Sequence, residues 1–244
     1  MTEVGAVEVR GEGGASEIVL LCEHASNHIP ERYNGLGLSD ADIQRHIAWD
    51  IGAAEVTRRL SDALGAVAFL GGYSRLLIDL NRPLESPNSI VTRSEATDIP
   101  GNINIDEAER TYRIETIFTP FHDRVTAHLN ARQAKGLPTR IVSIHSFTPV
   151  YHGEARQWHG GVLFDKARAY GEAVLDRLRE PGLMLGANVP YQTSRDEDYG
   201  VPIHGDDRGI DAIMIEIRQD LISDPTGIDL WAQRLSKALQ RARI

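Results

Sequence analysis

Short apolar runs alternate along the chain with longer stretches of helical spacing, and this alternation constrains the fold more than any other feature. Strands that alternate with helices are typical of an α/β domain built on a mainly parallel sheet. We therefore predict a mixed, mainly parallel central sheet flanked by helices. The candidate strands span residues 17–23, 66–71, 75–80, 140–146, 160–165 and 212–219.

Four stretches between and after these runs predict helices. They span residues 39–65, 106–136, 165–180 and 229–244. The first begins with Ser39, a residue type that caps helix N-termini, and ends at Gly65. In the second, Pro120 should kink or break the helix, because proline has no amide hydrogen to donate.

Two long segments, residues 81–105 and 188–210, show no regular pattern. Loops of this length inside a compact domain are usually functional or disordered. The sequence contains no internal repeat, low-complexity tract or obvious linker. We interpret residues 1–244 as a single domain, in which the acidic, Gly-rich residues 1–15 form a flexible N-terminal segment.

Composition and charge narrow the class of function. A chain of 244 residues with 41% hydrophobic residues can bury a substantial core, and its formal net charge of −9 argues against a broad nucleic-acid surface. We find no signal-peptide pattern and no apolar run long enough to span a bilayer, so we expect a soluble, cytoplasmic protein that acts on a small molecule. The single cysteine, Cys22, lies in an apolar run and should serve packing. The sequence is silent on oligomeric state.

Polar side chains gather where the predicted strands end, which is where open α/β sheets bind their ligands. Glu23 and His24 follow the first strand, Asp79 ends the third, His145 ends the fourth, and Glu216 lies in the last. A single histidine at a strand end is more often a structural residue than a ligand. Two imidazoles with carboxylates nearby are, however, the donors of a zinc site with two histidines and one oxygen ligand.

Five blocks of the sequence resemble a known family. The blocks "CEHASNHIP", "HIAWDIGA", "SRLLIDLNRP", "HSFTP" and "HGDDRGIDAIMIEIRQDLI" look like successive blocks of the N-formylglutamate amidohydrolase family, in the same order, and cover most of the chain. That family is similar in turn to the zinc carboxypeptidase and aspartoacylase group, with its mixed α/β sheet flanked by helices. The resemblance implies a zinc-dependent hydrolase that removes a formyl-type acyl group from an acidic amino acid such as N-formylglutamate.

The resemblance also implies the metal ligands. His24 falls at the first zinc ligand of the family and His145 at the last. The carboxypeptidase-like pattern His-x-x-Glu places the middle ligand at Asn27, but a neutral amide is a poor zinc ligand beside a carboxylate. The alternative is Asp50, one turn beyond His46 on the predicted helix. We take Asp50 as the third ligand and assign Asn27, with the nearby Ser26, to substrate contact.

The remaining roles follow from the same resemblance. Asn81 and Arg82 match a pair that looks like the clamp for the substrate carboxylate, and the guanidinium fork suits that task. Arg208 and Arg218 are candidates for stabilising the oxyanion or contacting the substrate. His204 could polarise the carbonyl or contact the substrate, and could equally cap a loop.

Glu216 falls at the general base of the wider group. Side chains alternate along a strand, so Ile215 and Ile217 should face away from it. The run "DAIMIEI" is otherwise apolar on both faces, which favours a buried central strand with Glu216 in the crevice over an edge strand with Glu216 in solvent. Two other functions stay open, a hydrolase of another N-acyl amino acid or small peptide and a non-catalytic binding protein. Glu216 argues against the binding protein, which needs no carboxylate beside the metal.

Overall fold

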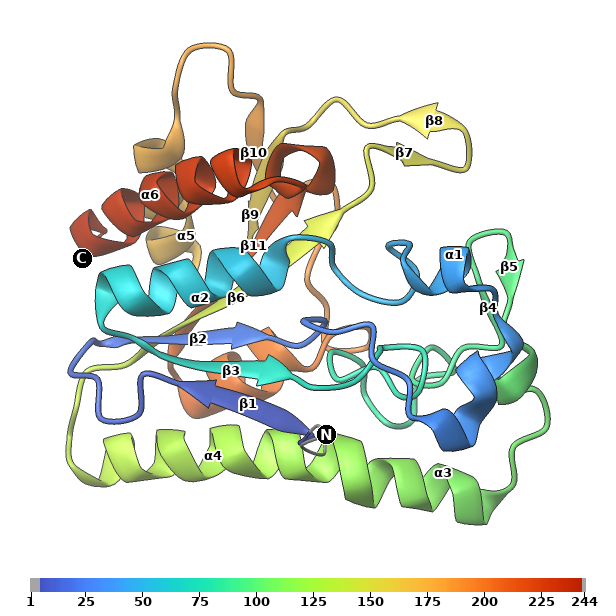
Figure 1. Cartoon of the computed structure of the whole chain (residues 1–244). Coiled ribbons are helices and arrows are strands. Elements are labelled where there is room, and N and C mark those ends of the chain that lie inside the picture. Colours follow the sequence, from blue (N-terminus) through green and yellow to red (C-terminus); the bar gives the residue numbers. More distant parts are fainter. Residues whose placement is uncertain (1–4, 243–244) are drawn as a thin grey trace.

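A seven-stranded sheet lies between two layers of helices in the computed structural model, which describes residues 5–242 (Figure 1). The strand order is β1-β3-β2-β6-β11-β9-β10. The central strands β3, β2, β6 and β11 are parallel, whereas β1 and the β9–β10 pair run in the opposite direction. The predicted mixed, mainly parallel sheet is confirmed. The strands are β1 (Val7–Arg10), β2 (Ile18–Cys22), β3 (Val67–Gly71), β6 (Arg140–Phe147), β9 (Gly160–Leu163), β10 (Leu185–Ala187) and β11 (Asp211–Arg218).

Helices cover both faces of this sheet. One face packs against α2 (Ala53–Leu64), α5 (Arg168–Leu178) and α6 (Pro225–Arg241), and the other against α4 (Thr119–Ala134) and the segment after β3 (Figure 1). In β2, Leu20 and Cys22 face the first of these cores while Val19 and Leu21 face the second. Because β2 and β3 are buried on both sides, these strands are continuous apolar runs. The buried, unpaired Cys22 lies in this packing, as predicted.

The chain order of the strands creates a crevice between β2 and β6. From β2 the chain passes through α2 to β3 on one side, whereas β6 pairs with β11 on the other side. Ligands bind at such a switch point, beyond the carboxyl ends of the strands. Two hairpins, β4 (Arg93–Ser94) with β5 (Thr97–Asp98) and β7 (Val150–Tyr151) with β8 (Glu154–Ala155), project beyond this edge (Figure 1).

The predicted strands are confirmed to within a few residues, except the one at residues 75–80, which is wrong. This segment forms buried turns, and its carbonyl groups accept hydrogen bonds from side chains instead of a neighbouring strand. Asn102 donates to the carbonyl of Leu76 at 2.7 Å and Arg113 to that of Leu77 at 2.9 Å. An apolar run can therefore be buried without pairing in a sheet.

The helix predicted over residues 39–65 is interrupted. It forms α1 (Asp40–Ile43) and α2, separated by a non-helical loop over residues 44–52. Gly52 closes this loop with φ of 82°, and a Cβ there would lie 2.2 Å from the carbonyl oxygen of Ile222, so only glycine fits. The expectation that Asp50 lies on a helix is wrong, because it belongs to this loop. Its backbone amide donates to the carbonyl of His24 at 3.0 Å.

The other predicted helices are present with shifted ends. In the second, α3 (Glu107–Arg113) passes through a wider π turn, η3 (Ile114–Phe118), directly into α4, so Pro120 sits in the first turn of α4 instead of breaking a helix. The irregular segments 81–105 and 188–210 contain only short elements. These are the β4–β5 hairpin, η2 (Pro100–Asn102), η4 (Gly200–Gly205) and η5 (Asp206–Arg208), and elsewhere the chain forms η1 (Glu31–Gly37) and η6 (Gln219–Ile222).

The N-terminal segment differs from the prediction. Residues 7–10, expected to be flexible, form β1 and pair with β3 in antiparallel register, while residues 1–4 lie outside the described part of the chain. Across residues 5–242, none of the helices has the length and apolar character that crossing a membrane requires.

Candidate metal centre and active site

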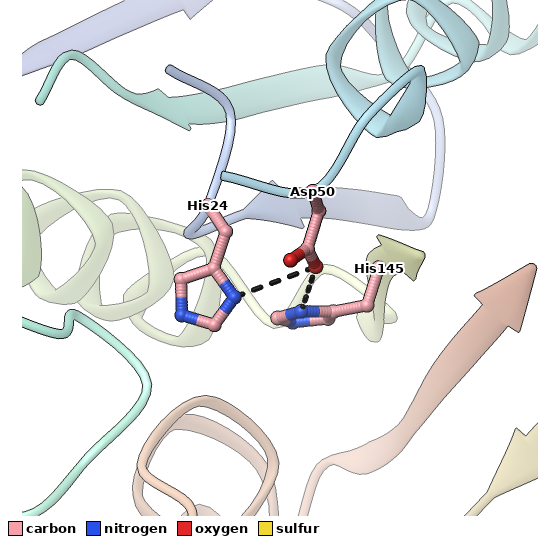
Figure 2. A group of neighbouring side chains, drawn as sticks. All are labelled: His24, Asp50 and His145. Carbon is pink, nitrogen blue, oxygen red and sulfur yellow. Dashed lines mark hydrogen bonds and ion pairs between the residues drawn. The ribbon is translucent and has the colours of Figure 1, made fainter. Parts of the chain in front are cut away.

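Three buried side chains meet at the crevice between β2 and β6. His24 follows β2, His145 lies near the end of β6, and Asp50 comes from the loop before α2. Their donor atoms lie within 4.8 Å of one another (Figure 2). The Oδ2 atom of Asp50 lies 2.8 Å from Nδ1 of His145 and 3.4 Å from Nδ1 of His24. These three residues are almost fully buried, with 2% exposure for His24, 4% for Asp50 and 3% for His145. Protein contacts, and not bulk water, therefore fix their arrangement.

Each histidine is oriented by a carboxylate on its other ring nitrogen. His24 Nε2 lies 2.6 Å from Oδ1 of Asp79, and His145 Nε2 lies 3.1 Å from Oε2 of Glu23. A carboxylate at Nε2 holds the ring proton there, which leaves the Nδ1 lone pair facing the cluster. This is how metal-ligating histidines are held in proteins. The donor set of two imidazoles and one carboxylate therefore fits a zinc ion.

The carboxylates behind the histidines are themselves held in place. Arg75 donates to Oδ2 of Asp79 through Nε at 2.9 Å and Nη2 at 2.7 Å, and its Nη1 lies 3.4 Å from Oδ1 of Asp50. The hydroxyl of Ser143, two residues before His145 on β6, donates to Oε2 of Glu23 at 2.6 Å. The ring orientations of both histidines are thus fixed by the sheet and by the loop after β3.

The electrostatics favour a cation at this position. Burial opposes ionisation of Asp50, but His24 and His145 outweigh it and lower the pKa of this carboxyl well below its usual range. Burial also opposes ionisation of Glu23, but hydrogen bonds from His145 and Ser143 lower its pKa to about 2. Conversely, Asp50 and Glu23 overcome burial and raise the pKa of His145 well above its usual value. The ionised carboxylates of Asp50 and Glu23 are thus stabilised by a positive charge beside them, which a metal cation would supply in place of a proton.

A cavity of about 520 Å³ opens beside the three residues, and Glu216 and Met214 of β11 line it. Ile215 and Ile217 pack into the core on the other face of the sheet, so Glu216 faces the crevice as the alternation predicts. Burial, partly opposed by the charge of His145, raises the pKa of Glu216 to about 8. Within residues 5–242, its Oε2 atom has no hydrogen-bond partner.

Asn81 and Arg82 also line the cavity, and they tie the two irregular segments together. The amide of Asn81 donates to Oδ1 of Asp198 at 3.1 Å. Arg82 donates from Nη1 to the carbonyl of Glu197 at 2.6 Å and to Oδ1 of Asp198 at 3.3 Å. The side chain of Arg82 is 23% exposed and belongs to the cavity lining, so part of it is accessible to a ligand.

Ser26 and Asn27 do not line the cavity. The hydroxyl of Ser26 accepts a hydrogen bond from the backbone amide of His28, and the amide of Asn27 donates to the carbonyl of Ile43 at 3.1 Å. Asn27 thus anchors α1 to the segment after β2. Of the two alternatives for the third metal ligand, Asp50 lies with the histidines, whereas the side-chain amide of Asn27 bonds to Ile43.

His204, Arg208 and Arg218 lie outside the cavity lining as well. His204 is buried and pairs with His122, with 2.9 Å between its Nε2 and Nδ1 of His122. Arg208 donates to the side chain of Asn130, and Arg218 pairs with Asp220 at 2.8 Å. The structure therefore does not bring these three predicted site residues to the cavity.

Several residues of the site were not assigned from the sequence. Arg75 and Asp79 stand four residues apart in the block "SRLLIDLNRP", and that spacing was the signal available for their ion pair. Asp198 and Tyr191 line the cavity from the irregular segment 188–210. The length of that segment pointed to a function, but nothing in its sequence identified which side chains would reach the cavity.

The chain is similar to several proteins of known structure. The sequence has 39% identity to a gene product of Agrobacterium tumefaciens whose crystal structure superposes with a TM-score of 0.94, covering 98% of this chain and 94% of that one. An N-formylglutamate amidohydrolase from Ralstonia eutropha has the same fold, with a TM-score of 0.64, 17% identity and coverage of 97% and 96%. A metallo-carboxypeptidase from Burkholderia cenocepacia superposes with a TM-score of 0.36 and 12% identity, over 97% of this chain and 59% of that one.

A search of curated proteins found no match to the sequence. The sequence model described as N-formylglutamate amidohydrolase matches residues 16–223, which include β2 through β11 and every residue of the three-residue cluster. The chain belongs to the N-formylglutamate amidohydrolase family.

Proposed function

We propose that the protein is a zinc-dependent amidohydrolase that removes a formyl-type acyl group from an acidic amino acid, with N-formylglutamate as the expected substrate. Membership of the family supports hydrolysis of an amide. Metal dependence rests on one observation, the buried cluster of His24, Asp50 and His145 beside a cavity. A cavity of about 520 Å³ suits a small molecule. We expect the enzyme to act in the cytoplasm, in amino-acid metabolism.

His24, Asp50 and His145 would hold the ion. When bound through three protein ligands, zinc provides a Lewis acid and lowers the pKa of water toward neutrality. Asp79 and Glu23 keep the two imidazole rings turned toward Asp50, and Arg75 holds Asp79. This chain's contribution is therefore a clustered set of donors in which the orientations of the two imidazole rings are already fixed.

Glu216 is our candidate for the proton carrier. Its carboxyl lines the cavity, and its Oε2 atom is free of hydrogen bonds to any other described residue. It would accept a proton from the attacking water and deliver that proton to the leaving nitrogen. A carboxyl group with a pKa near the working pH suits both steps, and burial raises the pKa of Glu216 to about 8, a value that the charge of a bound cation would lower.

Arg82 and Asn81 are our candidates for binding a substrate carboxylate. Arg82 lines the cavity and is partly exposed, and Asp198 and the carbonyl of Glu197 fix the position of its guanidinium. A fixed guanidinium loses little entropy when it binds a carboxylate. We keep Ser26, Asn27, His204, Arg208 and Arg218 out of this mechanism, because each is engaged elsewhere in the fold.

Substrate hydrolysis by the purified protein tests the proposal. The panel is N-formylglutamate, N-formylaspartate, N-acetylglutamate and a small dipeptide, and zinc content is measured on the same preparation. We expect bound zinc and fastest turnover of a formylated acidic amino acid. Faster turnover of the acetylated compound or the dipeptide would favour another hydrolase on this scaffold. Bound ligand without turnover of any compound would favour a binding protein.

A further inference from the structure

A substrate with two carboxylates needs a second cation besides Arg82, and a cation whose charge is not already neutralised would suit it best. The arginines that line the cavity are all paired with carboxylates. Arg75 pairs with Asp79 at 2.7 Å, Arg82 with Asp198 at 3.3 Å, and Arg93 with Asp98 at 2.7 Å. The lining also carries further carboxylates, including Glu216. The cavity lining therefore offers little unpaired positive charge to a substrate with two carboxylates.

Arg156 is different, because no carboxylate of the described residues pairs with it. It follows the β7–β8 hairpin, which projects beside the carboxyl end of β6 (Figure 1). Its Cζ atom lies 4.7 Å from the ring centre of Tyr151, 4.9 Å from that of Tyr191 and 5.6 Å from that of Phe147. Tyr151 and Tyr191 both line the cavity. Arg156 is not itself among the lining residues, but its guanidinium packs against these two side chains of the cavity lining.

Aromatic rings hold a guanidinium in place without cancelling its charge. The ring faces attract the cation, while the hydrogen-bond donors at the guanidinium edge stay available for a planar anion. Tyr191 adds a fixed contact, because its Oη accepts a hydrogen bond from Nη1 of Arg156 at 2.5 Å. The backbone is anchored too, since Arg218 donates from Nη1 to the carbonyl of Arg156 at 3.2 Å. This arrangement orders the side chain before any ligand arrives.

We propose that Arg156 binds one of the two carboxylates of the substrate. Tyr151, Tyr191 and Phe147 would hold its guanidinium in the position for binding. The proposal rests on the proposed function and deepens it, because it assigns the preference for a dicarboxylate to a residue outside the five sequence blocks that resemble the family. Arg82 and Arg156 would then each bind one carboxylate. Arg218 acts indirectly, as a positioning residue for Arg156.

The test compares Arg156→Gln with the parental enzyme on three substrates. They are N-formylglutamate and its two mono-amides, in which either the α-carboxylate or the side-chain carboxylate is capped. We expect kcat/KM to fall by about 10- to 100-fold for N-formylglutamate and for the one mono-amide that retains the carboxylate bound by Arg156. The other mono-amide lacks that carboxylate and should change little. Equal losses on all three, or no loss, would overturn the proposal.

Two further variants separate charge from packing. Arg156→Lys retains the positive charge and should recover part of the lost discrimination between the substrates. Tyr191→Phe removes the hydroxyl contact but keeps the ring, so it should preserve the discrimination that Arg156→Gln abolishes. If Arg156→Lys discriminates no better than Arg156→Gln, the role of the residue is structural and the proposal fails.

A binding measurement tests the role of Arg156 independently of whether the protein hydrolyses the formylated compounds. Glutarate carries two carboxylates and no amide, so its binding can be followed by calorimetry in the absence of turnover. We expect Arg156→Gln to weaken glutarate binding by about 10-fold or more. This result would support the role of Arg156 even if the protein hydrolysed none of the formylated compounds. Equal binding by both proteins, or by neither, would overturn it.

Discussion

Glu216 and His145 are paired positions on the neighbouring parallel strands β11 and β6. Side chains at paired positions of a sheet point to the same face, so the carboxyl and the imidazole both face the cavity. The metal ligand and the proton carrier that we propose are therefore positioned by sheet register, whereas the substrate contacts come from loops. For these residues, we expect changes of His145 or Glu216 to alter the chemistry and changes of Arg82 or Arg156 to alter the substrate specificity.

Glu216→Gln tests the proton carrier. The amide keeps the shape of the side chain but cannot accept the proton, so kcat should fall by about two to four orders of magnitude. Zinc content should not change, because Glu216 is not one of the three clustered residues. Glu197→Gln is the matched control, since Glu197 also lines the cavity but is exposed to solvent. If the Glu216→Gln enzyme turned over substrate at close to the parental rate, Glu216 would not be the proton carrier.

His24→Ala tests the metal ligands through zinc content alone. The variant should lose stoichiometric zinc, because two of three protein donors rarely hold the ion tightly. His46→Ala is the control, since His46 lines the same cavity without belonging to the cluster. We expect it to keep its zinc. Unchanged zinc affinity in His24→Ala, measured by competition with a chelator, would remove His24 from the ligand set.

Arg82→Ala tests the other carboxylate contact. The side chain is partly exposed and also bonds to the loop at Glu197, so we expect a loss of about 10- to 100-fold in kcat/KM for a substrate with a free carboxylate. An analogue with the relevant carboxylate capped should be affected much less, and zinc content should stay normal. If the variant kept the full preference for the free carboxylate, Arg82 would not be the clamp.

A site residue could be predicted from the sequence when local sequence properties set its position, and could not when contacts between distant segments set it. His24, His145 and Glu216 were located at the cavity because strand periodicity and strand ends are local properties of the sequence. Asp50 was selected for its chemistry, although the helix assigned to it was wrong. Gly52 and its contact with Ile222 interrupt that helix, and such a contact between distant segments leaves no periodic signal.

The substrate contacts were harder to predict for the same reason. Arg218 lies two residues beyond Glu216, but at the strand end its guanidinium turns to Asp220. Arg208 looked catalytic because it lies in the block that leads to Glu216, yet it bonds to Asn130 of α4. Arg156 carries no motif, and only the tertiary structure places Tyr191, 35 positions later in the chain, against it.

A pH-dependent stability should arise from His204. Burial lowers the pKa of His204 to about 4 and that of His122 to about 3, so both are neutral in the folded protein, whereas the unfolded chain takes up protons near pH 6.5. Their contribution to stability is complete above about pH 6.5 and is lost as the pH falls through the folded values. For His204 alone the loss between pH 7 and pH 4 is about 3 kcal/mol.

Urea unfolding of the His204→Asn variant at pH 7 and pH 4 measures this contribution. The variant should be less stable than the parent at pH 7 but should lose less stability on acidification. His152→Asn serves as the control, because His152 is exposed at the tip of the β7–β8 hairpin. Equal losses of free energy of unfolding in the parent and in His204→Asn would show that His204 does not titrate on unfolding.

Reconstitution of the metal-free protein with zinc tests the central claim most directly. Formate release from N-formylglutamate is followed while zinc is added stepwise to protein stripped by a chelator. Since one cluster of His24, Asp50 and His145 is proposed to hold one ion, activity should be absent at the start, rise linearly and reach its plateau at one zinc per chain. Full activity of the metal-free protein, or no activity at any zinc concentration, would contradict the account.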